Sequence, residues 1–108
     1  MKEPEMRILC LTLNREPFVE ILEGRKKVEY RWFKPYWITR LHNKEYDIVQ
    51  FSNGYGNDRP AMRVEFKGIR IFTGSSPIGT GQQYAISLGD VLETWKTSKL
   101  LNQGLVKE

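Results

Sequence analysis

The sequence predicts a small α+β domain: a partly open β-barrel of about five or six strands with one N-terminal helix packed against it. Three observations lead to this prediction. The 108 residues fit one compact domain. One amphipathic helical pattern lies near the N-terminus, and strand-like runs separated by Gly and Pro follow it. Small sheets tend to curl and close because closure removes exposed edges. We expect residues 1–95 to form the domain and residues 96–108 to form a tail, either mobile or a short helix.

The first two elements are expected to be a strand and a helix. Residues 6–13 form a short apolar run typical of a largely buried strand, in which Cys10 would be a small buried apolar side chain. Glu16 and Pro17 then open a helical pattern, since Pro fits the first position of a helix. Gly24 follows and predicts a left-handed helix stop. The apolar residues of this helix fall on one face: Phe18, Ile21 and Leu22.

The next strand is expected over residues 27–33, where apolar and charged side chains alternate. Val28, Tyr30 and Trp32 would take an apolar inner face. Lys27, Glu29, Arg31 and Phe33 would take the other face, toward solvent or a cleft. Residues 35–45 are expected to be irregular or a short helical turn.

The rest of the chain predicts further strands. A strand is expected over residues 46–51. A long strand over 61–72 is expected to bend or bulge at Gly68, where a Gly interrupts the alternation. Residues 73–81 are rich in Gly and Ser and predict a loop. The final strand covers residues 84–88, with a possible extension over 90–95.

The composition excludes several classes of protein. One Cys cannot form an internal disulfide, and one Cys with one His cannot supply the usual tetrahedral zinc site, so we expect neither metal nor cofactor. No apolar run approaches the ~20 residues that cross a bilayer. The first residues contain no apolar segment typical of a signal peptide. The expectation is a soluble cytoplasmic protein without a membrane partner.

The positive charge is concentrated in residues 25–44. This window holds seven basic residues and one acid, a net charge of +6, whereas the whole chain carries +4. Five aromatic residues are interleaved with these cations. Such a pattern suits a single-stranded nucleic acid, because cations pair with phosphates and flat rings stack on bases. The alternative is that the cations are solvated and the aromatic rings belong to the core.

The densest part of this window runs from Gly24 to Arg31. Glu29 and Arg31 are two residues apart on the expected strand and therefore share a face, and Lys26 can turn toward it from the preceding junction. A carboxylate between two cations can orient their donors and accept an N–H from a base. A lysine in such a site can also act as a nucleophile or base. The alternative is a surface Glu–Arg pair worth ~0–1 kcal/mol.

The spacing Gly24-x-Lys26-x-x-Glu29-x-Arg31 resembles the GxKxxExR signature of the ASCH (activating-signal cointegrator homology) family. The preceding helix 17–23, the following segment 30–35 and the late strand 84–89 are also similar to that family, so the resemblance covers residues 6–92. It implies a PUA-like β-barrel with a cleft between barrel and helix, and a role in RNA binding. One branch of the family resembles amidohydrolases that act on N4-acetylcytidine, and others are linked to ribonuclease activity. Lys26 matches the catalytic lysine of the amidohydrolase branch, which has Thr in place of Glu29.

Three functional hypotheses follow. The first is an RNA- or nucleic-acid-binding module that holds a base or modified nucleoside in the cleft. The second is a small hydrolase of modified nucleosides, or a ribonuclease, with Lys26 and Glu29 as catalytic residues. The third is an adaptor for an unidentified protein partner. Residues 52–60 are expected to be a turn that could also wall the cleft. The candidate ligand-binding residues are Arg25, Lys26, Glu29, Arg31, Lys34, Tyr36, Trp37, Asn53 and Tyr55.

Overall fold

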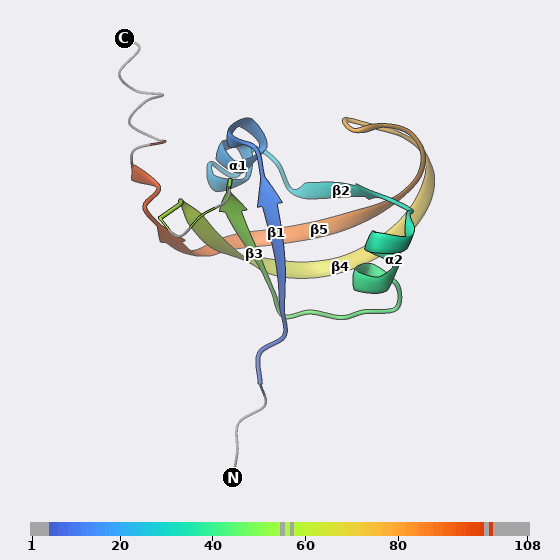
Figure 1. Ribbon diagram of the computed structural model, residues 1–108, viewed down its shortest axis with the longest axis horizontal. Helices are drawn as coiled ribbons and strands as arrows, with labels where there is room; N and C mark the ends of the chain where they lie inside the picture. Colours follow the sequence, from blue (N-terminus) through green and yellow to red (C-terminus); the bar gives the residue numbers. More distant parts are fainter. Residues whose placement is uncertain (1–4, 55, 57, 99, 101–108) are drawn as a thin grey trace.

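The computed structural model of the chain describes residues 5–54, 56, 58–98 and 100 (Figure 1). Its described part is an α+β fold with one mixed five-stranded sheet of order β1-β3-β4-β5-β2. Strands β1 and β3 pair in parallel, and the other neighbours are antiparallel. The elements in chain order are β1 (Ile8–Leu13), α1 (Arg15–Leu22), β2 (Val28–Trp32), α2 (Pro35–Leu41), β3 (Ile48–Asn53), β4 (Ala61–Ser76) and β5 (Gly79–Trp95).

The core lies on the face of the sheet that α1 covers. Strand β1 alternates, so that its leucines are buried while Cys10 and Thr12 are exposed on the opposite face. The expectation of a buried Cys10 is therefore wrong, because the period-two alternation of a half-buried strand, not the run of apolar residues, decides its position. The buried core comprises Leu9, Leu11, Leu13, Phe18, Ile21, Leu41, Val49, Phe51, Met62, Val64, Tyr84, Ile86, Leu88 and Leu100.

Helix α1 ends as its sequence indicates, but it begins at Arg15, before the expected opening at Glu16 and Pro17. Pro17 lies in its first turn. Backbone N–H groups there have no carbonyl acceptor within the helix, so the N–H that proline lacks costs the helix no hydrogen bond. Gly24 has φ +80°, the left-handed conformation that ends many helices. The backbone N–H groups of Arg25 and Lys26 both donate to the carbonyl of Glu20, at 2.9 and 3.1 Å. These bonds fix the connection that brings Lys26 to the start of β2.

A second helix, α2, occupies most of the segment expected to be irregular or a single helical turn. Pro35 stands at its first position, and Lys34 before it is extended with φ −134°. The helix buries Leu41 and packs Trp37 and Ile38 partly against the core. The expectation of one helix is therefore corrected to two, because this short helix is held by its packing rather than by a clear amphipathic pattern.

Strands β4 and β5 form one long hairpin where the sequence predicts a loop over residues 73–81. Buried Gln83 holds its two arms together: Nε2 donates to the carbonyls of Gly74 and Gly79 at 3.0 and 2.9 Å, and Oε1 accepts from Ser76 Oγ at 2.5 Å. A Cβ at Gly79 would lie 3.0 Å from the Trp32 ring. The glycines of this segment therefore do not mark a loop. They leave room for the Trp32 ring to pack directly against the backbone of the hairpin.

The bulge expected in β4 is confirmed. Gly68 has φ +128°, and the pairing of β4 with β5 shifts register between Phe66 and Gly68. Such a shift strengthens the local twist. Beyond the end of β2 the long hairpin bends, and its far end folds back above β2 (Figure 1).

The two faces of β2 differ from the expected pattern. Tyr30 packs edge-on against Phe72, and Trp32 covers the glycines of the hairpin, so these rings lie under the hairpin and not in the main core. Glu29 is instead buried on the face shared with Ile86. The reason is that the hairpin curls over β2 and covers its second face. The alternation of apolar and charged residues along β2 does not reveal this cover.

The sheet is not closed into a barrel. Strands β1 and β2 stand at the two ends of the strand order, and neither pairs with the other in the described part of the chain. The sheet nevertheless curls, and Figure 1 shows β1 crossing in front of β4 and β5. A side chain spans the remaining gap, because Arg31 Nη2 of β2 donates to the Thr12 carbonyl of β1 at 3.4 Å.

The chain beyond β5 is described only in part. Leu100 packs into the core, and its backbone N–H donates to the Thr97 carbonyl at 3.0 Å. The expected tail beyond that point, residues 101–108, lies outside the described residues. Within the described residues, no helix has the length and apolar character needed to span a bilayer.

Candidate functional site

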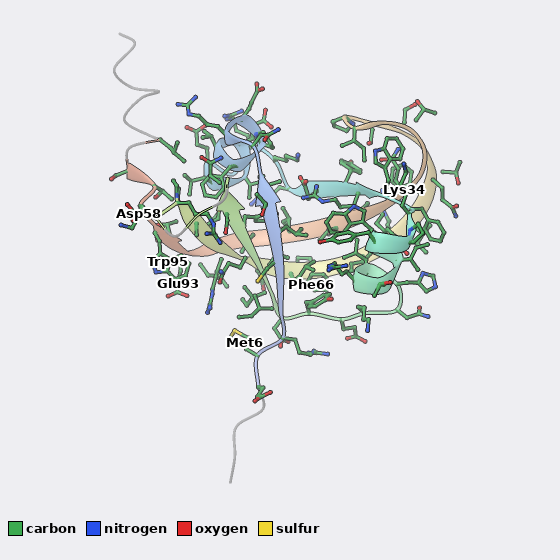
Figure 2. The ribbon with its side chains drawn as sticks, in the orientation of Figure 1. Met6, Lys34, Asp58, Phe66, Glu93 and Trp95 are labelled. Carbon is green, nitrogen blue, oxygen red and sulfur yellow. The ribbon has the colours of Figure 1, made fainter. Side chains whose placement is uncertain are left out.

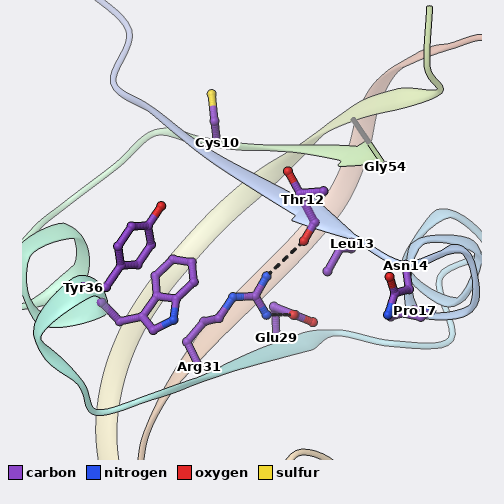
Figure 3. A pocket seen from close by; sticks show the side chains of 10 residues that line it. Cys10, Thr12, Leu13, Asn14, Pro17, Glu29, Arg31, Tyr36 and Gly54 are labelled. Carbon is purple, nitrogen blue, oxygen red and sulfur yellow. Dashed lines mark hydrogen bonds and ion pairs between the residues drawn. The ribbon is translucent and has the colours of Figure 1, made fainter. Parts of the chain in front are cut away.

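A cleft of about 570 Å³ opens between the facing edges of β1 and β2. The start of α1 closes one end and α2 closes the other (Figure 3). Its volume lies within the ~300–1,000 Å³ typical of small-molecule sites. The lining residues are Cys10, Thr12, Leu13, Asn14, Pro17, Glu29, Arg31, Tyr36, Trp37 and Gly54.

An ion cluster stands on the β2 side of this cleft. The Glu29 side chain is only 4% exposed, and those of Arg31 and Lys26 are 15% and 21% exposed. Arg31 Nη1 donates to Glu29 Oε2, while Lys26 Nζ lies 2.8 Å from Glu29 Oε1. The three residues meet because positions 29 and 31 share a face of β2 and the turn at Gly24 delivers Lys26 beside them.

The guanidinium of Arg31 is fixed by more than this carboxylate. It donates to the carbonyls of Tyr30 and Thr12 at 2.9 and 3.4 Å, and it lies 5.1 Å from the ring centre of Trp37. Figure 3 shows Arg31 reaching between Thr12 and Glu29. A guanidinium held on several sides presents its remaining donors in a defined direction, which favours recognition of a planar partner.

The Glu29 carboxylate keeps one acceptor position open. Its Oε1 atom is buried and accepts no hydrogen bond from the described residues. Lys26 Nζ is close enough for an ion pair, but it does not provide a hydrogen bond of good geometry. A buried polar atom normally has a hydrogen-bond partner, so an N–H or O–H that reached this oxygen beside Lys26 would satisfy it.

Five predicted site residues meet at or beside the cleft: Lys26, Glu29, Arg31, Tyr36 and Trp37. Of these, Lys26 is not a lining residue and reaches the site only through Glu29. The aromatic pair forms a wall, with the rings of Tyr36 and Trp37 centred 4.7 Å apart and nearly perpendicular. The cleft therefore combines a charged floor with flat side walls.

The other predicted site residues are placed elsewhere. Arg25 pairs with Glu23 at 2.6 Å beside α1, and that hydrogen bond raises the pKa of Arg25. Lys34 is exposed before α2 and does not line the cleft. Asn53 Nδ2 donates to the Leu13 carbonyl at 3.2 Å, so it supports the strand end. Tyr55 lies outside the described residues.

The β1 side of the cleft was missed by sequence reasoning. Thr12, Leu13 and Asn14 contribute to it at the strand-to-helix junction. Asn14 precedes α1 as its N-cap residue, yet its side chain makes no capping hydrogen bond. An Asn before a helix is a recognisable start signal. Its place in the cleft depends on the parallel pairing of β1 with β3, which no local pattern predicts.

Comparison of the chain with family models, with curated proteins and with solved structures gave no match. No group of three or more His, Cys, Asp or Glu that could hold a metal ion occurs among the residues that the structure describes.

Proposed function

We propose that this protein binds single-stranded nucleic acid, preferably RNA, and holds one base or modified nucleoside in the cleft between the curled sheet and its helices. The proposal includes membership of the PUA-like ASCH group, in which this cleft would be the ligand site. The observation that carries the proposal is the buried Glu29 carboxylate, which is flanked by two cations and retains one open acceptor.

The polar floor suits the edge of a nucleobase. Glu29 Oε1 can accept an amino or ring N–H, and the neighbouring guanidinium of Arg31 can donate to a carbonyl or ring nitrogen. A base that offers a donor and an acceptor side by side would satisfy both groups. A base would stack on a face of Tyr36 or Trp37 that Arg40 and Arg31 leave uncovered, a contact worth ~1–3 kcal/mol per base.

The basic window provides the charge for the backbone of the strand. Lys34 and Lys44 are exposed on either side of α2. The Arg40 guanidinium lies 3.6 Å from the ring centre of Tyr36, so cation and ring form one surface beside the cleft. With about three or four phosphate contacts, the logarithm of affinity should fall with the logarithm of salt concentration with a slope near −2 to −3.

Fluorescence anisotropy of a labelled single-stranded RNA octamer, measured over a range of salt concentrations, tests this proposal. We expect salt-dependent binding that Arg31→Gln weakens about tenfold or more. Arg25→Gln provides a matched control, because it removes the same charge from the same signature outside the cleft. Absence of binding, or equal loss in the two variants, would contradict a site in the cleft.

The 2.8 Å contact between Lys26 and Glu29 favours a second candidate, a hydrolase of acylated nucleosides. Water would attack the acyl carbon and the C–N bond would break, releasing a carboxylic acid while the amine of the base takes up a proton. Lys26 would act as the base or nucleophile only after its ammonium passed a proton to Glu29, which would be its acid–base partner. Chromatography of N4-acetylcytidine incubated with the protein tests this candidate: hydrolysis that is lost in Lys26→Ala supports the enzyme, whereas hydrolysis retained in that variant, or none in the wild type, contradicts it.

A further inference from the structure

A second groove, of about 270 Å³, lies on the outer face of the sheet near the end of β5. Figure 2 shows Trp95 and Asp58 together at this end of the molecule, on the opposite side from Lys34. The groove is lined by Gln50, Ser52, Arg59, Ala61, Trp95 and Lys96. None of these residues belongs to the cleft between β1 and β2.

An arginine in this groove lacks a partner for one of its donors. Arg59 Nε is buried and donates to no group among the described residues. A buried guanidinium N–H without an acceptor is unfavourable, and an anion is the partner that would satisfy it best. The other cation of the groove, Lys96, is held by Asp58 at 2.5 Å. The unsatisfied donor therefore points to an anionic group of a ligand.

An exposed ring stands beside this arginine. Trp95 is 40% exposed, although large aromatic side chains are usually well buried. The guanidinium of Arg63 lies 5.7 Å from the centre of its ring and is positioned by Gln50, whose Oε1 accepts from Arg63 Nε at 2.9 Å. Glu93 Oε1 lies 3.9 Å from Arg63 Nη1 and offsets part of the positive charge of Arg63. Arg63 lies over one side of this ring, and the exposed part of the indole beside the unsatisfied Arg59 donor could stack a base and bind its phosphate.

The sheet register connects the groove to the cleft. Thr12 on the cleft rim is paired with Ser52, Ser52 with Ala61, and Ala61 with Trp95. Residues paired in this way share one face of a sheet, and neighbouring strands are about 4.8 Å apart. Three such steps place Thr12 on the cleft rim and Trp95 about 14 Å apart across the outer face, a span that a few nucleotides can bridge.

We infer that this groove binds a phosphate and the adjoining base of the strand whose other base occupies the cleft. The phosphate would take the open donor of Arg59, and the base would stack on Trp95. This inference rests on the proposed function. It adds a second contact to that function, so that an oligonucleotide would bind more tightly than a single nucleoside.

Anisotropy with a labelled single-stranded RNA octamer separates the two contributions. Arg59→Gln should weaken binding and reduce the steepness of the log–log salt dependence by about 0.7, because one phosphate contact is lost. Trp95→Ala should weaken binding about tenfold and leave that slope unchanged, because stacking carries no charge. Trp95→Phe should retain most of the affinity, which distinguishes a lost ring from a damaged fold.

Arg70→Gln is the matched control, since Arg70 is exposed over Phe72 at 5.2 Å and lies in neither site. If Arg59→Gln and Trp95→Ala bind the octamer as Arg70→Gln does, the groove is not a contact site and this inference is wrong. The proposed function would then still stand on the cleft variants. If wild-type protein binds no octamer at any salt concentration, the proposed function and this inference both fail.

Discussion

Replacement of Glu29 by Gln tests whether the cluster beside the cleft depends on a buried charge. The substitution keeps the shape of the side chain and removes its negative charge. The amide has one acceptor oxygen, so it cannot serve Arg31 and Lys26 together as the carboxylate does. Both cations would remain in place without a counter-charge.

The structure gives the size of the effect. Breaking a fully buried ion pair costs about 3–5 kcal/mol, and a hydrogen bond to a charged group is worth about 1.5–3 kcal/mol. The side chains of Lys26 and Arg31 are 21% and 15% exposed, and Arg31 keeps its two carbonyl acceptors. We therefore expect a loss of about 2–4 kcal/mol. A domain of this size has about 5–16 kcal/mol of stability, so the variant should remain folded.

Urea denaturation followed by far-ultraviolet circular dichroism measures this loss. In thermal unfolding followed by the same signal, the melting temperature should fall by roughly 9–18 °C. In a double-mutant cycle, Arg31→Gln in the Glu29→Gln background should cost less than in the wild type by about 1–3 kcal/mol. A Glu29→Gln variant within about 0.5 kcal/mol of wild type would refute the reasoning, because the cluster would then behave as a surface pair.

Three further outcomes follow from the fold. The backbone N–H and the side chain of Arg7 hydrogen-bond Asp47 and lower its pKa from 3.8, so the stabilisation is present above that value and is lost as the pH falls through the lower folded pKa. Asp47→Asn should therefore unfold at lower urea than wild type at pH 7, and the difference should disappear in acid. Gln83→Leu should cost about 2–4 kcal/mol in urea denaturation, because it removes the hydrogen bonds that the buried Gln83 amide donates to two half-buried carbonyls of the hairpin. Gly68→Ala should cost about 1–3 kcal/mol by the same measurement, because φ +128° is strained for any residue with a Cβ. Equal stability in either of the last two variants would show that the hairpin geometry is not held as described.

Local signals in the sequence predict much of this fold. The end of α1 at Gly24 and the bulge at Gly68 follow from the backbone freedom of glycine, and both are confirmed. The shared face of Glu29 and Arg31 follows from the two-residue period of a strand, and these side chains do meet. Features that depend on one residue type or one short spacing were therefore accessible without a structure.

Features that depend on long-range packing were not accessible. Cys10 is exposed because β1 has only one buried face, which becomes clear only after β1 pairs with β3, some 40 residues away. The hairpin around Gly79 reads as a loop until Trp32 is placed against it. The open edge between β1 and β2 likewise depends on the curl of the whole sheet.

The central claim is that the cleft receives a nucleobase, and the three tryptophan indole N–H signals in a ¹⁵N-edited NMR spectrum test it most directly. Trp37 lines the cleft, Trp95 lines the outer groove, and Trp32 lies under the hairpin in neither site. Titration with cytidine and modified cytidines should shift the Trp37 signal and leave Trp32 unmoved. A Trp37 signal that stays fixed throughout titrations with nucleosides and with the RNA octamer would contradict the claim.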